Sequence, residues 1–136
     1  MLRQSYKPTG LSLPHAAQAA YDYAVRAGDM VYISGQVARD ADGNPVGVGD
    51  FEAQAVQVFE NLKRVLASAG GTLADIVDTR MYILDRANRV KLNEVRRRYY
   101  PGPDFPCSTL LVVAGLVHPD LLLEIEAVAY LPLGKG

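Results

Sequence analysis

The strongest constraint on the fold is one amphipathic helix that lies between segments with strand-like alternation. Asp50 is a typical helix N-cap, because its carboxylate can accept hydrogen bonds from the free N–H groups of the first turn. The apolar residues that follow recur at helical spacing and form one stripe: Ala55, Val58, Phe59, Leu62, Val65 and Leu66. Gly70 and Gly71 predict the end of this helix.

Alternating or continuous apolar segments on both sides of this helix predict strands. These segments are 21–26, 30–36, 77–85, 108–114 and 122–131, and the first two flank Gly28 as a hairpin. A second helix is expected over 87–100, with Leu92, Val95 and Tyr99 on its inner side. The continuous apolar run 108–114 is typical of a strand at the centre of a sheet.

The resulting order is β-β-α-β-α-β-β, in one domain of 136 residues, with residues 1–20 as an irregular lead-in. This order predicts an α+β fold in which both helices cover one face of a single mixed sheet. Val77, Thr79, Met81 and Ile83 are expected on the helix-covered face. The other face is expected to be half apolar and to carry Tyr82, Glu124, Glu126 and Val128. A sheet face of this kind must be wetted or covered by another subunit, so we expect an oligomer.

The charge balance argues against nucleic acid as a partner. Lys and Arg number 14 against 15 Asp and Glu, a net charge of -1, whereas binding to phosphates needs a basic surface. Arg96, Arg97 and Arg98 are consecutive on the second predicted helix, so they spread around it rather than form one patch. No run approaches the roughly 20 apolar residues of a membrane span, and no leader is evident, so we expect a cytoplasmic protein without a membrane partner.

Cysteine and histidine give no sign of a metal site. Cys107 is the single cysteine and has no adjacent cation to activate it, which favours a small buried hydrophobic role. His15 and His118 do not stand at the spacing of metal ligands. The sequence therefore predicts no metal.

Two short motifs could carry chemistry. Glu124 and Glu126 lie two apart on one strand, so they point to the same side, either as a general base or as charges paired across an interface. Ser34 and Gly35 end a strand, where a backbone N–H could bind a carbonyl or anion, or where the strand could simply bulge. From the residues alone, both alternatives stay open, with the structural ones favoured.

Several segments together resemble the Rid/YjgF family of reactive imine and enamine deaminases, also described as endoribonuclease L-PSP-type. The matching segments extend from Tyr21 to Ala129 at nearly constant spacing: Tyr21, Ile33–Gln36, Asn61–Lys63, Val65–Leu66, Ala69–Gly70, Asn93–Val95 and Glu124–Ala129. The resemblance implies a chorismate-mutase-like fold and a homotrimer whose sheets form a central barrel, with three clefts between subunits. It also implies hydrolysis of small imines such as 2-iminopropionate, without a metal or organic cofactor.

The resemblance assigns site residues one by one. Tyr21 matches a substrate-contacting tyrosine, Ser34–Gly35 a backbone amide site, Asn93 a cleft asparagine and Glu124 the catalytic glutamate that positions the attacking water. The family's arginine motif falls on Pro106–Thr109, which makes Cys107 and Ser108 substrate-binding candidates.

Serine stands at position 108, where the resemblance places the arginine that binds a substrate carboxylate. Serine offers one neutral donor instead of two parallel charged ones, which makes deamination of 2-imino acids doubtful unless another cation, such as Arg80, takes this role. Three hypotheses follow: an enzyme acting on a small imine, enamine or enol through Glu124, a non-catalytic trimeric module that binds a metabolite in the same clefts, and a ribonuclease, against which the charge balance counts.

Overall fold

The computed structural model describes residues 3–11 and 20–134. Its strands are β1 (Arg3–Tyr6), β2 (Ala24–Ala27), β3 (Met30–Val37), β4 (Ile76–Ile83), β5 (Cys107–Val112) and β6 (Leu123–Tyr130). Its helices are α2 (Phe51–Ser68) and α3 (Arg89–Tyr99), with short 3-10 turns at Leu73–Asp75 and Arg86–Asn88. None of the helices described is both long and apolar enough to cross a membrane.

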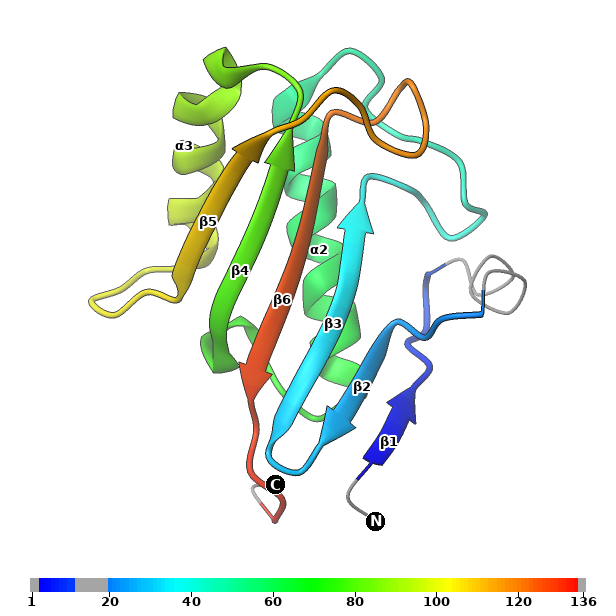
Figure 1. Ribbon diagram of the computed structural model, residues 1–136, viewed down its shortest axis with the longest axis vertical. Helices are drawn as coiled ribbons and strands as arrows, with labels where there is room; N and C mark the ends of the chain where they lie inside the picture. The colour runs from blue at the N-terminus through cyan, green and yellow to red at the C-terminus, as the bar shows by residue number, and fades with distance from the viewer. Residues whose placement is uncertain (1–2, 12–19, 135–136) are drawn as a thin grey trace.

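All six strands form one sheet in the order β1-β2-β3-β6-β4-β5. Of the strand pairs in residues 3–11 and 20–134, β4 and β5 alone run parallel, so the sheet is mixed. Figure 1 shows α2 and α3 side by side behind the sheet, with the front face free of helices. The expected α+β architecture, with two helices on one face, is therefore confirmed.

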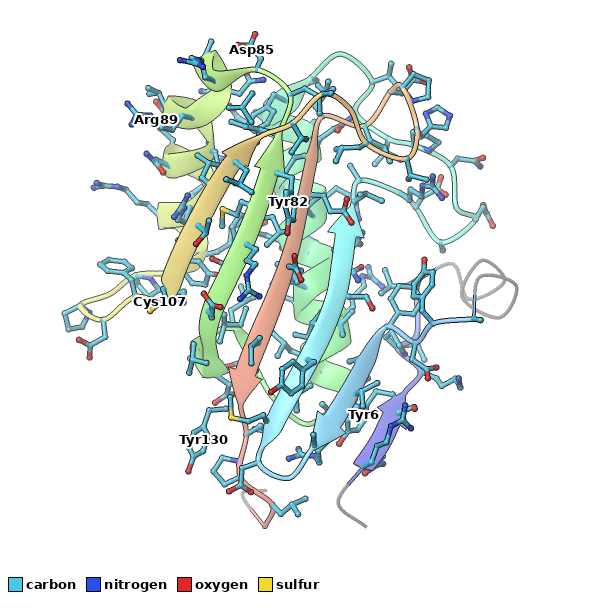
Figure 2. The ribbon with its side chains drawn as sticks, viewed as in Figure 1. Tyr6, Tyr82, Asp85, Arg89, Cys107 and Tyr130 are labelled. Atoms are coloured by element: carbon cyan, nitrogen blue, oxygen red, sulfur yellow. The ribbon has the colours of Figure 1, made fainter. Side chains whose placement is uncertain are left out.

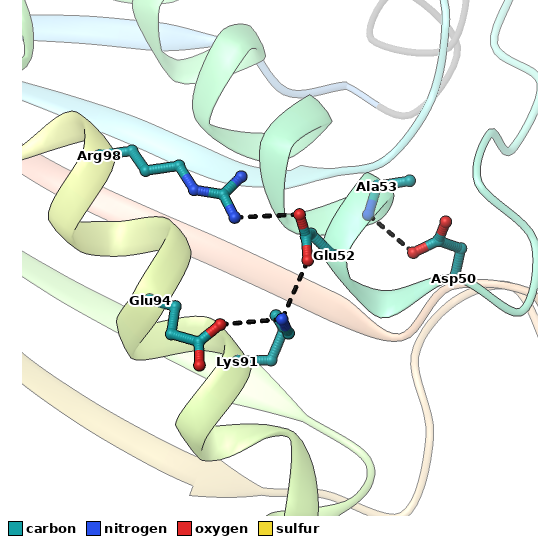
Figure 3. Close-up of polar contacts among 6 residues, drawn as sticks. All are labelled: Asp50, Glu52, Ala53, Lys91, Glu94 and Arg98. Carbon is teal, nitrogen blue, oxygen red and sulfur yellow. Dashed lines mark hydrogen bonds and ion pairs between the residues drawn. The ribbon is translucent and has the colours of Figure 1, made fainter.

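Helix α2 forms where its local sequence predicts it. The Asp50 side chain accepts a hydrogen bond from the Ala53 N–H at 3.0 Å, and every residue of the predicted apolar stripe is buried. Gly70 adopts a φ of +84° just after the helix, a conformation that glycine takes without steric cost. Across the helix pair, Glu52 forms ion pairs with Lys91 and Arg98 of α3 (Figure 3).

The two faces of the sheet differ sharply in character. On β6, Leu123, Ile125, Ala127 and Ala129 are buried under the helices, whereas the alternate residues point to the open face. The open face carries Tyr82, labelled in Figure 2 near the end of β4, with Glu124, Glu126 and Val128 as predicted. Exposed apolar side chains on this face include Tyr32, Leu111 and Tyr130.

Gln54 of α2 fixes the entry of β6. Its buried side-chain amide donates to the Asp120 carbonyl at 2.7 Å and accepts from the Leu122 N–H at 2.8 Å. These bonds hold the loop that leads into Glu124 against the helix layer. A buried polar side chain is stable here because both ends of its amide are bonded.

Several expectations need correction. Arg3–Tyr6 is a strand paired with β2 rather than part of an irregular lead-in, while residues 12–19 and His15 lie outside the described residues. A register shift after Ile76 turns Ile76 inward and leaves Val77 exposed. The second helix begins at Arg89, two residues later than expected.

The prediction that the apolar run 108–114 forms a central strand is also wrong. Among the strands of the described residues, β5 is an edge strand that pairs only with β4, and Leu111 and Val112 remain about half exposed (50% and 49%). A continuous apolar run indicates burial on both faces, and within one chain this strand is not buried in that way.

Candidate functional site

The predicted site residues fall into two separate groups in the chain. One group lines a cavity at the end of β3 and the start of β6, which we call the β3–β6 cavity. The other lines a pocket between α3 and the edge strand, which we call the α3–β5 pocket. Each group has its own chemistry.

The β3–β6 cavity has a volume of about 110 Å³ and brings together Tyr21, Gly35 and Glu124. Its other lining residues are Leu11, Tyr23, Gln36, Val37, Arg39, Asp40, Asn61 and Val117. The three residues that the resemblance assigns to a tyrosine, an amide and a glutamate are therefore adjacent in space, although more than 100 positions separate Tyr21 from Glu124.

Glu124 is partly buried and its carboxyl is electrostatically perturbed. Burial raises the pKa of Glu124 above its ordinary value, and the neighbouring Glu126 carboxylate raises it further. Glu126 itself accepts a hydrogen bond from the Tyr82 hydroxyl, whose pKa is raised chiefly by that bond. Glu126 thus has a structural partner, while the structure gives the Glu124 carboxylate no bonding partner among the residues it describes. A partly buried carboxyl with a raised pKa is suited to take up and return a proton.

Gly35 gives the Glu124 carboxylate its space. The β3–β6 pairing shifts register between Ile33 and Gln36, which places Gly35 in a bulge. A Cβ built on Gly35 would lie 2.1 Å from Glu124 Oε1. The bulge expected at Ser34–Gly35 is therefore confirmed, and the group that approaches Gly35 closely is the Glu124 carboxylate.

Ser34 has a bonding pattern of its own. Its Oγ donates to the Asp22 carbonyl at 2.6 Å, and its backbone N–H donates to the Tyr23 carbonyl at 2.9 Å. Both donors are used within the chain, where they tie the segment that follows Tyr21 to β3. In this structure Ser34 positions the wall of the β3–β6 cavity.

Arg39 is a cavity residue that the sequence analysis missed. It lines the β3–β6 cavity with Glu124, and its Nε–H is buried without a partner among the described residues. It follows the end of β3, where its spacing carries no motif. Only the fold brings Arg39 into the same cavity as Glu124, a residue far away in the sequence.

The α3–β5 pocket has a volume of about 370 Å³ and contains Asn93 and Ser108. Ser108 pairs with buried Thr79 and points to the helix side of the sheet. Arg96 of α3 donates from Nη1 to the Ser108 Oγ at 3.1 Å. The remaining lining residues are Thr79, Arg97, Tyr100, Phe105 and Pro106.

Cys107 and Arg80 do not enter this pocket. Cys107 alternates with Ser108, so it lies on the open face opposite Asp78, and it is exposed rather than buried as expected (Figure 2). Arg80 is also on the open face, where its guanidinium lies 3.7 Å from the Asp78 carboxylate. Within one chain, neither side chain therefore lies on the face of Ser108, and Arg80 does not supply a cation there.

The two groups cannot contact one small molecule within a single chain. One row of paired residues crosses the sheet through Ser108, Thr79, Ala127 and Ile33. Three strand intervals therefore separate Ser108 from Ile33, which directly precedes Ser34. At about 4.8 Å per interval this separation is roughly 14 Å. Ser108 also faces the helices, whereas Glu124 faces the open side. Among residues 3–11 and 20–134, no cluster of three or more His, Cys, Asp or Glu could hold a metal ion.

Comparisons with known proteins agree on one family. The family model described as "Endoribonuclease L-PSP" matches residues 12–131. A RutC family protein from Pyrococcus horikoshii is 36% identical over 110 residues, which are 81% of this chain and 86% of that protein.

Two solved structures show the same fold over nearly the whole chain. The protein YjgH is 32% identical with a TM-score of 0.85, over 97% of this chain and 98% of that one. RidA from the Antarctic bacterium Psychrobacter is 33% identical with a TM-score of 0.84, over 94% and 99%.

Proposed function

This chain belongs to the endoribonuclease L-PSP family, also called Rid/YjgF, and from that premise we propose that it hydrolyses or tautomerises a small imine, enamine or enol without a cofactor. Family membership supports a function on small molecules. The proposal adds a reaction class, a catalytic residue and a place for the site.

The observation that carries the proposal is the environment of Glu124. Its carboxylate is partly buried, has a pKa raised by burial and by Glu126, and shares a cavity with Tyr21 and Gly35. A structural charge pair would give this carboxylate a cationic partner, as Glu52 has in Lys91 and Arg98. Glu124 instead borders open volume beside a backbone that approaches closely.

Hydrolysis of an imine at this site needs only proton transfers. Glu124 accepts a proton from water while the water oxygen forms a bond to the imine carbon and the C=N electron pair moves to nitrogen. Glu124 returns this proton to the nitrogen, which gives a carbinolamine. The carbinolamine hydroxyl then passes its proton through Glu124 to the amino group, so that the C=O bond forms, the C–N bond breaks, and ammonia and a carbonyl compound leave. The raised pKa of Glu124 favours both halves of this exchange, because the carboxyl holds its proton more readily than an exposed one.

We propose that the complete cleft forms between copies in a homotrimer. Three observations support this: the uncovered open face, the half-exposed apolar edge strand β5, and the separation of the β3–β6 cavity from the α3–β5 pocket. A second copy that sets its α3–β5 pocket against the first copy's β3–β6 cavity would complete a site for one small ligand. Nucleic acid is not part of the proposal, because a net charge of -1 does not favour binding to phosphates.

The test is the variant Glu124→Gln with Glu126→Gln as its matched control on the same strand and face. With 2-iminopropionate generated in situ, Glu124→Gln should lose about 10²-fold or more of its kcat, while Glu126→Gln keeps most of its rate. Binding of pyruvate, the stable product, should persist in both variants. If the wild-type protein binds pyruvate but turns over neither the imine nor a neutral enamine, the non-catalytic binding module is the correct alternative.

A further inference from the structure

Glu124 borders two cavities in the chain. It lines the β3–β6 cavity, and it also lines a hollow of about 380 Å³ on the open face of the sheet, which we call the open-face pocket. Gly35 borders both cavities as well. The open-face pocket adds two polar residues, Tyr82 and Glu126, and the loop after β5 completes its wall with Val113, Gly115 and Leu116. The proposed base therefore shares a pocket with a second set of polar groups.

The register of the sheet brings Tyr82 together with both glutamates of β6. Tyr82 is paired with Glu124, and two residues along the strands Arg80 is paired with Glu126. The Tyr82 hydroxyl donates to the diagonal neighbour, the Glu126 carboxylate (Figure 2). The guanidinium of Arg80 lies 3.7 Å from the Asp78 carboxylate on its own strand. One of the two neighbouring glutamates thus has a hydroxyl donor, and the other has none among the described residues.

Two carboxyls on one face of a strand compete for the same proton. Burial raises the pKa of Glu124, and the charge of Glu126, two residues away, raises it further. A hydroxyl that donates to a carboxylate favours the ionised form of that carboxylate. The bond from Tyr82 therefore favours the ionised form of Glu126, so a proton that reaches the pair is held by Glu124.

We propose that Tyr82 is a positioning residue that, through its bond to Glu126, directs the proton of the carboxylate pair to Glu124. This inference rests on the proposed function and deepens it, because Glu124 is the base in that reaction. Glu126 then supplies a fixed negative charge and takes no proton during the exchange between water, Glu124 and the substrate nitrogen. Tyr82 acts through Glu126 and does not itself touch the substrate.

Other titratable or charged side chains surround the pair on the neighbouring elements. They are Arg80 and Asp78 on β4, Tyr32 on β3, and Tyr21, Tyr23, Arg39 and Asp40 in the β3–β6 cavity. The loop residues that line the open-face pocket carry no titratable group. All of these side chains remain in Tyr82→Phe and Glu126→Gln, so a change in the titration of Glu124 in those variants comes from the Tyr82–Glu126 pair.

The first test follows the proton directly and needs no turnover. Glutamate labelled with carbon-13 at the side-chain carboxyl is incorporated, and NMR follows the signals from pH 3 to 8, with the Glu124 signal assigned by its absence in Glu124→Gln. Tyr82→Phe keeps the aromatic ring and removes only the hydroxyl. Its matched control is Tyr32→Phe, on the same face of the sheet opposite Val128. Thermal unfolding confirms that each variant is folded.

We expect the Glu124 transition to shift to lower pH in both Tyr82→Phe and Glu126→Gln. In Tyr82→Phe the proton is shared with Glu126, and in Glu126→Gln the neighbouring charge is absent. Tyr32→Phe should leave the transition where it is in the wild type. A Glu124 transition that stays in place or moves to higher pH in Tyr82→Phe would overturn the role of Tyr82, whatever Glu126→Gln does.

The kinetic arm is the pH profile of kcat/KM for a small imine. At pH values above the Glu124 transition, Tyr82→Phe and Glu126→Gln should lose about twofold at most, because Glu124 is ionised in every protein. Their acidic limbs should move to lower pH together with the NMR transition. An equal loss of rate at every pH without movement of the limb would mean a structural role for Tyr82 and would overturn the proposal. A shifted Glu124 transition without turnover in any protein would support this inference and overturn the proposed enzyme activity instead.

Discussion

The carboxylate of Glu124 occupies the space that a side chain at Gly35 would need. A Cβ on Gly35 would lie 2.1 Å from Glu124 Oε1, far closer than two atoms can approach without bonding. The bulge in β3 therefore brings bare backbone against the partly buried carboxyl of Glu124 in the β3–β6 cavity. Glycine at this position and glutamate on β6 are therefore sterically coupled.

Replacing Gly35 with alanine tests this unit. The Gly35 backbone is not in the left-handed region, so alanine fits its conformation, but the new methyl group must displace the Glu124 carboxylate. We expect kcat for imine hydrolysis to fall by about 10²-fold, because a shift of about 1 Å in a reacting group has effects of that size. Thermal unfolding should change little. Full activity in Gly35→Ala would show that the position of Glu124 does not matter for the reaction.

The raised pKa of Glu124 predicts a pH-dependent stability difference. A carboxyl with a higher pKa in the folded state favours folding when protonated, and this contribution is lost as the pH rises through the folded pKa. Glu124→Gln resembles the protonated form, so at pH 7 it should unfold at a higher temperature than the wild type. The difference should vanish below the ordinary pKa of 4.5. Unfolding curves from pH 3 to 8 measure it, and a difference independent of pH would contradict the burial of this carboxyl.

Gln54 is predicted to act on the site through the β6 entry. Gln54→Leu leaves the Asp120 carbonyl and the Leu122 N–H without their partner, which should lower the free energy of unfolding by about 2 kcal/mol. Gln57→Leu, on the same helix, removes a bond to Asn61 and should cost about 1 kcal/mol or less. Chemical denaturation of both variants gives the comparison. Equal losses would mean that Gln54 has no special role in holding β6.

The open face is predicted to be an interface between copies. Sedimentation should give about three times the 14.8 kDa of one chain. Leu111→Lys places a charge on an open-face position that is 50% exposed in one chain, and it should dissociate the trimer. Val90→Lys, at a 62% exposed position on α3, should leave the trimer intact. A wild-type monomer in solution would contradict the proposed cleft.

The sequence predicted those elements whose evidence is local. Asp50 caps α2 and the apolar stripe behind it is buried, because both features depend on residues within a few turns of one another. The hairpin around Gly28 forms for the same reason, with Ala27 paired to Met30.

Features that depend on distant partners were missed or misplaced. Arg3–Tyr6 has no strong alternation and becomes a strand only by pairing with β2. The apolar run of β5 predicts a central strand, but β5 lies at an edge of the sheet in one chain. Hydrophobicity alone does not distinguish a strand buried by neighbouring strands from one buried by another subunit. Arg96 is one of three consecutive arginines in the sequence. Only the fold shows that its guanidinium donates a hydrogen bond to Ser108 on β5.

The most direct measurement is activity in mixed oligomers. Glu124→Gln removes the proposed base in the β3–β6 cavity, and Ser108→Trp fills the α3–β5 pocket, so each variant alone should be inactive toward 2-iminopropionate. If each cleft combines these two groups from different copies, co-folding the two variants in equal amounts restores about a quarter of the clefts, and thus about a quarter of the wild-type rate. Mixed oligomers that form but stay inactive would contradict a site shared between copies.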